Sequence, residues 1–267
     1  MMRGCFFARP STSLRYAFPI VNTVSKKKPV ARTPLVLITG ASQGLGAAFA
    51  VAYARAFPGV RLALVARTAK TLAATEAKCT RLGADAHAFV CDVADEAVVA
   101  RLPAAVTKQF RRAPDIVINN AGRFTPAKLA DTPPALFDTM IAGNLRSAYL
   151  VTHAFLPALQ KRGTGDFVFI SSICGKMGLP GCAAYTVAKH GLTGLAAALR
   201  AETRGTGLRV MAIHPGAIAT PIWAGSDLPR ERLMTAASVA EAVVALTSLD
   251  ANTVAEDVLL RPGPGDF

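Results

Sequence analysis

A tyrosine and a lysine stand four residues apart, at Tyr185 and Lys189 in the sequence YTVAK. On an α-helix this spacing places both side chains on one face, so the ammonium group lies near the phenol. A free phenol has a pKa of about 10 and exchanges its proton poorly at neutral pH. A neighbouring cation favours the phenolate and lowers that pKa toward the range in which an acid–base catalyst works. We therefore predict that Tyr185 exchanges a proton with a substrate and that Lys189 tunes its pKa.

Two further polar residues could complete this chemistry. Ser172 follows an apolar run, 13 residues before Tyr185, and could hold a substrate oxygen against the phenol. Asn144 lies in a long helical stretch and could continue a water-linked proton path toward Lys189. Each residue taken singly is ordinary, because a tyrosine–lysine pair is most often a solvated pair on a helix surface. Their order after a glycine-rich turn is what favours the catalytic interpretation.

The glycine-rich turn is TGASQGLG at 39–46, directly between an apolar run and a helical stretch. Glycines let a backbone turn tightly and approach a pyrophosphate, and the following helix offers free N–H groups and the positive end of its dipole. The spacing is G-x-x-x-G-x-G rather than G-x-G-x-x-G, so the flanking strand and helix carry much of the argument. The residues expected at a dinucleotide cofactor are Gly40, Ser42, Gln43, Gly44, Leu45 and Gly46.

The end of the next apolar run, at 62–65, indicates which dinucleotide is bound. An acidic residue about 20 positions past the glycines takes the ribose 2′-hydroxyl of NAD, whereas an arginine accommodates the 2′-phosphate of NADP. The sequence has no carboxylate before Glu76, and Arg67 stands next to the position of the missing acid. The alternative is that Arg67 is an ordinary solvated residue at a helix start. We predict NADP(H) in preference to NAD(H).

Polar residues also follow the third and fourth apolar runs. Asp92 comes just after the third run, and Asn119 opens the segment NNAG, which closes the fourth. Ligands bind at the carboxyl ends of the strands in open α/β sheets. We expect Asp92 near the adenine and Asn119 holding the loop, with Ala121 and Gly122 beside the cofactor. The alternatives are that Asp92 caps a helix and that Asn119 braces a turn.

Seven short apolar runs, each of strand character, alternate with six helical stretches after residue 34. The runs are 35–38, 62–65, 86–90, 116–118, 167–170, 210–213 and 258–260. The helical stretches are 45–57, 69–82, 95–112, 134–162, 183–204 and 238–249. This alternation is typical of βαβ units with right-handed crossovers. We predict one doubly wound, Rossmann-type α/β domain over 34–267, with about seven parallel strands and three helices on each face.

The composition fits one such domain and excludes several other classes of protein. The chain has 267 residues, 52% of them hydrophobic and 18% charged, which is enough apolar material for a core. No apolar run approaches the ~18–20 residues of a membrane-spanning helix. The five cysteines are scattered, so a disulfide scaffold is excluded, and we predict no metal. Basic residues are not interleaved with aromatic ones, so we predict no nucleic-acid partner.

The formal net charge of +13 is concentrated at the N-terminus. Residues 1–34 hold seven cations and no acid, which leaves 23 basic and 17 acidic residues in the remainder. Such a segment is typical of an organellar transit peptide. A disordered basic leader, or a start codon assigned too early, explains it equally well. We predict a leader over 1–33, with the protein in the mitochondrial matrix if the leader is a transit peptide and in the cytoplasm otherwise.

Taken together, the motifs resemble those of the short-chain dehydrogenase/reductase family over about residues 34–262. They are TGASQGLG at 39–46, NNAG at 119–122, NLRSAYL from Asn144, ISSICG at 170–175, YTVAK at 185–189 and HPGAIATP at 214–221. The resemblance implies Tyr185 as general acid/base, Lys189 as ribose ligand and pKa modulator, Ser172 as the group that orients the carbonyl, and Asn144 as the residue that completes a proton relay. It also implies cofactor contacts at Pro215, Gly216, Ile218 and Thr220, the last two at the nicotinamide carboxamide.

The reaction implied by the resemblance is NADPH-dependent reduction of a carbonyl to an alcohol. Gln43 departs from the family pattern, because NADP-preferring members often carry a basic residue there, so the preference rests on Arg67 and the missing acid. One alternative is an NAD(P)-dependent alcohol dehydrogenase that works in the oxidative direction. Others are a non-catalytic NADP-binding sensor and, more weakly, a basic organellar scaffold.

The sequence says less about the substrate and the assembly. Candidate substrates are a 3-oxoacyl thioester, a simple ketone or aldehyde, and a pterin-like or quinone carbonyl. The resemblance places a lid over 221–234, with Trp223 as a cover or as an anchor. Side chains that could line the pocket are Phe124, Met177, Leu179 and Cys182. Cys174 and Cys182 flank the expected active-site loop, as reactive thiols or as small buried apolar groups. Family members commonly form homodimers or homotetramers through their long helices.

Overall fold

The computed structural model describes residues 33–220, 230–263 and 265. The predicted leader, apart from Thr33, lies outside the described residues. So do Trp223 and most of the expected lid, at 221–229. Among the described residues, no helix is both long enough and apolar enough to cross a membrane.

Seven parallel strands form one sheet in the order β3-β2-β1-β4-β5-β6-β9. Their bounds are β1 (Leu35–Thr39), β2 (Arg61–Ala66), β3 (Asp85–Val90), β4 (Ile116–Asn119), β5 (Gly165–Ile170), β6 (Leu208–Pro215) and β9 (Asp257–Leu260). The chain order reverses between the neighbours β1 and β4, which makes the sheet doubly wound. The predicted fold class and the seven strands are confirmed.

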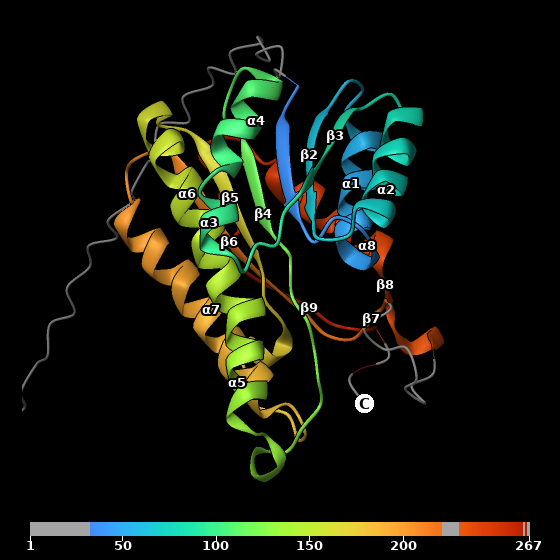
Figure 1. Ribbon diagram of the computed structural model, residues 1–267, viewed down its shortest axis with the longest axis vertical. Coiled ribbons are helices and arrows are strands. Elements are labelled where there is room, and N and C mark those ends of the chain that lie inside the picture. Colours follow the sequence, from blue (N-terminus) through green and yellow to red (C-terminus); the bar gives the residue numbers. More distant parts are fainter. Residues whose placement is uncertain (1–32, 221–229, 264, 266–267) are drawn as a thin grey trace, which may run out of the picture. The chain divides into compact units, whose positions relative to one another are not determined.

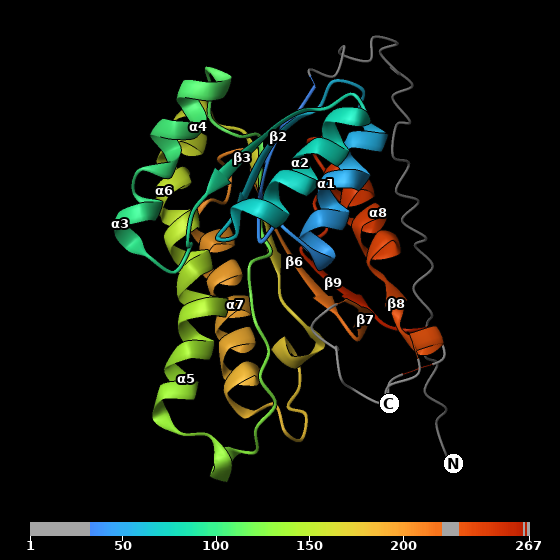
Figure 2. The same cartoon turned by 45° about the vertical axis from the view of Figure 1, so that its right-hand side comes forward.

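Helices pack on both faces of the sheet (Figures 1 and 2). The three helices predicted for each face are present. On one face lie α1 (Gly44–Ala56), α2 (Ala69–Arg81) and α8 (Ala236–Thr247). On the other lie α4 (Leu102–Phe110), α6 (Ser147–Arg162) and α7 (Ala183–Glu202). The short helix α3 (Glu96–Val99) adds Val99 to the core beside α4. Strand β1 supplies both cores, because Leu35 and Leu37 point to the second layer whereas Val36 and Ile38 point to the first. A strand that is buried on both faces must be apolar throughout, which explains the unbroken apolar runs.

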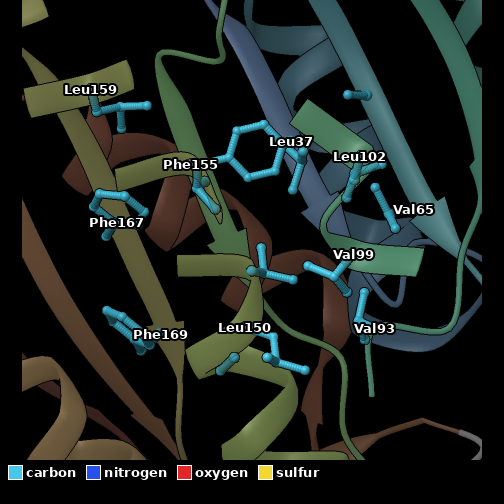
Figure 3. Packing of buried hydrophobic residues seen from close by; sticks show 14 of the residues in the cluster. Leu37, Val65, Val93, Val99, Leu102, Leu150, Phe155, Leu159, Phe167 and Phe169 are labelled. Carbon is cyan, nitrogen blue, oxygen red and sulfur yellow. The ribbon is translucent and has the colours of Figure 1, made fainter. Parts of the chain in front are cut away.

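Aliphatic side chains, together with a few phenylalanine rings, form the core under α4 and α6 (Figure 3). Phe155 of α6 and Phe167 of β5 are almost completely buried, and they belong to the same cluster as Leu37 and Leu102. This packing fixes α6 against the sheet. The helix segment that carries Asn144 is continuous with α6 and is held in place by it.

Two of the predicted helices are interrupted. The stretch 95–112 is divided into α3 (Glu96–Val99) and α4, because Pro103 at the start of α4 has no N–H group with which to continue a helix from α3. The stretch 134–162 comprises α5 (Pro134–Ile141), a π-helical turn at Ala142–Arg146, and α6. A π-helical turn widens the hydrogen-bonding pattern locally and is frequent at functional sites. Here it contains Asn144.

Several short elements complete the fold. Strands β7 (Ile218–Ala219) and β8 (Met234–Thr235) form a separate parallel pair, which was not predicted. Single 3₁₀ turns span Leu129–Asp131, Ile173–Gly175 and Arg230–Arg232. An isolated bridge between Ala127 and Cys182 joins the loop after β4 to the loop before α7.

Candidate active site

A cleft of about 1240 Å³ lies at the carboxyl ends of the central strands. It exceeds the roughly 300–1,000 Å³ of a typical small-molecule pocket, so a dinucleotide and a substrate fit together. Every site residue predicted from the sequence lines this cleft except Asn119. The loops that follow β4 and β5 run beside one another below the sheet, next to α5 and α7 (Figures 1 and 2).

The glycine turn joins β1 to α1 by a close backbone contact. A methyl group on Gly46 would overlap the carbonyl oxygen of Gly40 and lie 2.7 Å from the amide nitrogen of Asn120. Gly40 and Gly44 adopt positive φ angles of 66° and 54°, which favour glycine. No side chain caps the start of α1, where Gln43 is the N-cap residue, and its first turn holds no acidic residue. These uncapped N–H groups face the cleft and suit an anionic group.

Asn120, rather than the predicted Asn119, holds this turn to β4. The Asn120 amide donates to the carbonyl of Thr39 at 2.8 Å, and the backbone N–H groups of Asn120 and Ala121 both donate to the Thr39 hydroxyl. Asn119 points away from the cleft and donates to the Thr152 hydroxyl of α6 at 3.0 Å. Side chains alternate along a strand, so neighbouring asparagines face opposite ways. The doubled asparagine was visible in the sequence, but which of the two faced the cleft was not.

Arg67 and Asp92 face one another across the far end of the cleft. The Arg67 guanidinium lies 3.8 Å from the Asp92 carboxylate, and both side chains are substantially exposed, at 59% and 46%. An exposed pair at this distance is weak, so Arg67 is free to turn toward an incoming anion. Asp92 also accepts a hydrogen bond from the backbone of Ala94, which fixes the loop after β3.

Ser172 and Tyr185 meet at the other end of the cleft. Ser172 follows β5 and caps the 3₁₀ turn Ile173–Gly175, where its hydroxyl accepts from the Cys174 backbone at 3.1 Å. Tyr185, in the first turn of α7, lines the same part of the cleft, and its phenol is close enough to the Ser172 hydroxyl for that group to lower its pKa against the effect of burial. The ring of Phe124 packs edge-on against the Tyr185 ring, with their centroids 5.0 Å apart. Two hydroxyl groups therefore converge on one point beside an apolar wall.

Lys189 is buried one turn further along α7. Its ammonium donates to the Ile170 carbonyl at 2.8 Å and lies over the Tyr185 ring, 5.5 Å from the centroid. Burial lowers the pKa of Lys189 to about 8, because removal from water disfavours the charged form. The lysine is therefore close to its titration point at neutral to mildly alkaline pH.

The expectation that Lys189 lowers the pKa of Tyr185 is wrong for this structure. Burial raises the pKa of the Tyr185 phenol above its ordinary value, and the hydrogen bond from Ser172 opposes this rise. The sequence shows the spacing of the two residues on the helix, but it does not show that Lys189 is buried and Tyr185 half-buried. Tyr185 is consequently a protonated phenol throughout the neutral range.

Asn144 closes the back of the site through the backbone of the loop after β4. Its side chain accepts from the Arg123 N–H at 3.2 Å and donates to the carbonyls of Arg123 and Met140, both at 3.0 Å. A methyl group placed on Gly122 would lie 2.6 Å from the Asn144 oxygen and 3.7 Å from the Lys189 ammonium. The backbone of Gly122, which has no side chain, thus lies between Asn144 and Lys189.

The segment after β6 and three of the four predicted apolar residues complete the lining. Pro215, Gly216, Ile218 and Thr220 all border the cleft, as do Phe124, Leu179 and Cys182, but Met177 does not. Cys174 is buried and Cys182 half-buried, and both are free thiols. Burial raises the pKa of Cys182 to about 11, which fits a small apolar wall group better than a reactive thiolate.

A doubly wound parallel sheet with a glycine turn at its switch point defines a Rossmann-type fold. Residues 34–230 match the family model described as short chain dehydrogenase. The sepiapterin reductase of Chlorobaculum tepidum is 31% identical over 240 residues, which cover 87% of this chain and 98% of that protein. The chain therefore belongs to the short-chain dehydrogenase/reductase family, and it is an oxidoreductase.

Solved structures with bound dinucleotides share the fold. An alcohol dehydrogenase from the archaeon Thermococcus sibiricus, complexed with 5-hydroxy-NADP, matches with a TM-score of 0.80 and 27% identity, covering 87% of this chain and 97% of that one. A variant of the actinorhodin polyketide ketoreductase with NADPH matches with a TM-score of 0.80 and 28% identity, covering 88% and 98%. These neighbours support the use of NADP by this chain.

Proposed function

We propose that this enzyme reduces a ketone, an aldehyde or a 3-oxoacyl group to an alcohol with NADPH, and that Tyr185 donates the proton. The observation that carries the proposal is that Ser172 and Tyr185 line one cleft together with the glycine turn and Arg67. A carbonyl oxygen placed between the hydroxyls of Ser172 and Tyr185 accepts a hydrogen bond from each. Both contacts strengthen as negative charge develops on that oxygen.

The residues at the glycine turn fit a dinucleotide. The glycines let the turn fold tightly against itself and against Asn120, and the uncapped start of α1 beside it supplies N–H donors for a pyrophosphate. Arg67, at the end of β2, is placed to meet a ribose 2′-phosphate. Ile218 and Thr220, on the opposite wall, are placed to hold the nicotinamide carboxamide. When bound, NADPH supplies the hydride that adds to the carbonyl carbon.

The protonation states favour the reductive direction. The raised pKa of Tyr185 keeps the phenol protonated at neutral pH, and the protonated phenol is the form that donates to a developing alkoxide. The Tyr185 O–H bond breaks as the O–H bond of the alcohol forms. Lys189, with its pKa near 8, can then return a proton to the phenolate, and Asn144 lies next in line behind Gly122.

Cofactor binding and turnover are the tests. Calorimetry of NADPH and NADH on the wild-type protein is followed by assay of a panel of ketones, aldehydes and 3-oxoacyl thioesters. We expect tighter binding of NADPH and reduction of at least one class. Equal or tighter binding of NADH would instead favour an alcohol dehydrogenase that works oxidatively. Tight NADPH binding without turnover on any carbonyl or alcohol would favour a sensor.

The proposal includes self-association through α6 and α7. Tyr149 of α6 and Val187 of α7 are large apolar side chains that are each 48% exposed. Burying such surface between two copies is favourable, because apolar area is removed from water. Self-association is measured by sedimentation velocity of the wild type and of a Tyr149→Lys, Val187→Lys double variant. We expect a dimer or tetramer for the wild type and a shift toward monomer for the variant.

A further inference from the structure

A fully buried histidine lies directly behind Ser172. His214, in β6, has no exposed surface, and both nitrogens of its ring face an oxygen. Nδ1 lies 3.3 Å from the backbone carbonyl of Ser172, and Nε2 lies 2.9 Å from the carboxylate of Asp257 at the start of β9. Both oxygens are acceptors, and burial lowers the pKa of His214, so the neutral ring donates to one of them and only contacts the other. The ring thus fills the space between Asp257 of β9 and the residue that begins the 3₁₀ turn of the active site.

Asp257 also reaches the far end of that turn. Its carboxylate accepts from the Lys176 ammonium at 2.6 Å and from the Arg200 guanidinium of α7 at 3.2 Å. Both ends of the segment 172–176 are thus placed by one carboxylate: Lys176 bonds it directly, and the His214 ring is packed between it and Ser172. These cations and the His214 hydrogen bond outweigh burial and lower the pKa of Asp257, so the carboxylate is ionised at neutral pH.

We propose that Asp257 is a positioning residue for Ser172, acting through His214 and Lys176. The inference rests on the proposed function, in which Ser172 holds the substrate oxygen. The turn itself is a single short 3₁₀ turn, closed by a hydrogen bond from the Gly175 N–H to the Ser172 carbonyl and by one from the Cys174 N–H to the Ser172 hydroxyl. A turn this short needs outside support, and Asp257 supplies it.

The neighbouring acid offers a matched control. Glu256 precedes Asp257 and lies 3.8 Å from the same Arg200 guanidinium, but its side chain has no contact with segment 172–176 among those that the structure describes. Removal of Glu256 weakens the tie to α7 and leaves the ties to Ser172 and Lys176 intact. Comparing substitutions at Asp257 and Glu256 therefore separates a loss of activity caused by misplacement of Ser172 from one caused by a general disturbance of β9.

A double-mutant cycle on the full chain tests the coupling. We expect Asp257→Ala to lower kcat about 10-fold, since small misplacements of a catalytic group can cost up to about 100-fold, and to leave the Kd for NADPH within about twofold. In a Ser172→Ala background the same substitution should change kcat less than about twofold. Glu256→Ala should leave kcat unchanged. An equal loss of kcat in both backgrounds, or no loss in either, would overturn the proposal.

Amide hydrogen exchange provides a readout that needs no turnover. In Asp257→Ala the amides of Cys174, Gly175 and Lys176 should exchange about 10-fold faster than in wild type, whereas Glu256→Ala should leave them unchanged. Asp257→Asn, which keeps the shape and one acceptor oxygen, serves if the alanine variant does not fold. Unchanged exchange in a folded Asp257 variant would contradict the positioning role. Absence of carbonyl reduction by the wild type, or full activity of Ser172→Ala, would count against the proposed function instead.

Discussion

The ammonium of Lys189 lies over the face of the Tyr185 ring, 5.5 Å from its centroid, while it donates to the carbonyl that ends β5. The two residues share one helix face, as four-residue spacing requires, but both lie in an environment that penalises charge. The lysine is therefore pushed toward its neutral form and the tyrosine is held in its neutral form. This pairing gives a proton donor at neutral pH with a second titrating group directly behind it.

Lys189 should make stability depend on pH. Its folded-state pKa of about 8 lies below the value of an unfolded lysine, so the unfolded chain binds more protons between these two values. Stability from this group rises as pH increases through that window, by up to about 1.4 kcal/mol per pH unit. Urea unfolding at pH 7 to 9.5 should show this rise in wild type relative to Lys189→Met. If stability varied with pH in the same way in both proteins, the prediction would be contradicted. Lys70→Met, at an exposed position, is the control and should follow the wild type.

Tyr185→Phe should lower kcat for carbonyl reduction by at least about 100-fold, the usual scale of general acid catalysis. The Kd for NADPH should stay within about twofold, because the ring and its edge-on contact with Phe124 are retained. Stopped-flow single turnovers separate the chemical step from binding. A variant that keeps most of its kcat would remove Tyr185 from the mechanism.

Arg67→Ala should weaken NADPH binding by about 10-fold or more, because a charge-assisted hydrogen bond contributes about 1.5–3 kcal/mol. NADH binding should be unchanged, because NADH has no 2′-phosphate. Lys70, an exposed cation three residues further along, does not border the cleft, so Lys70→Ala should alter neither affinity. Isothermal titration at two salt concentrations measures all three proteins. If Arg67→Ala and Lys70→Ala weakened NADPH binding equally, the effect would come from the overall charge and not from a contact of Arg67 with the 2′-phosphate.

Two glycine-to-alanine substitutions should behave oppositely. Gly46→Ala forces a methyl group into the Gly40 carbonyl and should lower the free energy of unfolding by about 2 kcal/mol, as overpacking does, and weaken NADPH binding. Gly194→Ala, in α7, meets no atom within 4 Å and should stabilise the helix by about 0.5–1 kcal/mol. Urea titration of both variants checks the pair. A neutral Gly46→Ala would show that the turn can relax.

Asp166→Asn should destabilise the fold by about 3 kcal/mol, because it leaves the Arg209 guanidinium without its buried partner. The two side chains are 7% and 14% exposed and meet at 2.6 Å, and Arg209 also donates to carbonyls at the end of α8 and in the loop after it. Glu96→Gln removes half of the exposed pair with Arg146 and should change stability by less than about 1 kcal/mol. Similar losses in both variants would contradict the role of burial.

Much of the fold could be predicted from the sequence, because strands buried on both faces must be continuously apolar and each crossover needs a helix. Pro103 marks the division of the stretch 95–112 into α3 and α4, whereas the pattern of helix-forming residues predicts one helix there. The π-helical turn around Asn144 has no comparable signal, because it depends on packing against the loop after β4. Strands β7 and β8 have two residues each, too few to show the alternation of apolar and polar side chains that indicates a strand.

Site residues could be predicted where their position after a strand or in a motif identifies them. Properties that depend on how deeply a side chain is buried could not be predicted. Glycine spacing located the turn between β1 and α1, and strand ends located Arg67 and Asp92. The choice of Asn120 over Asn119 depends on which side of β4 faces the cleft. The raised pKa of Tyr185 depends on how deeply α7 packs. The link from Asp257 to Ser172 joins residues 85 positions apart, and no local pattern could reveal it.

The contact between Gly46 and the Gly40 carbonyl has an evolutionary consequence. Two positions in the turn are closed to every other side chain, since any methyl group there would collide with backbone or with Asn120. Divergence in this loop must therefore accumulate at the residues between the glycines, among them Ser42 and Gln43, whose side chains face the cleft edge. Substitution at such positions can change the groups presented to a ligand, while the shape of the loop stays the same.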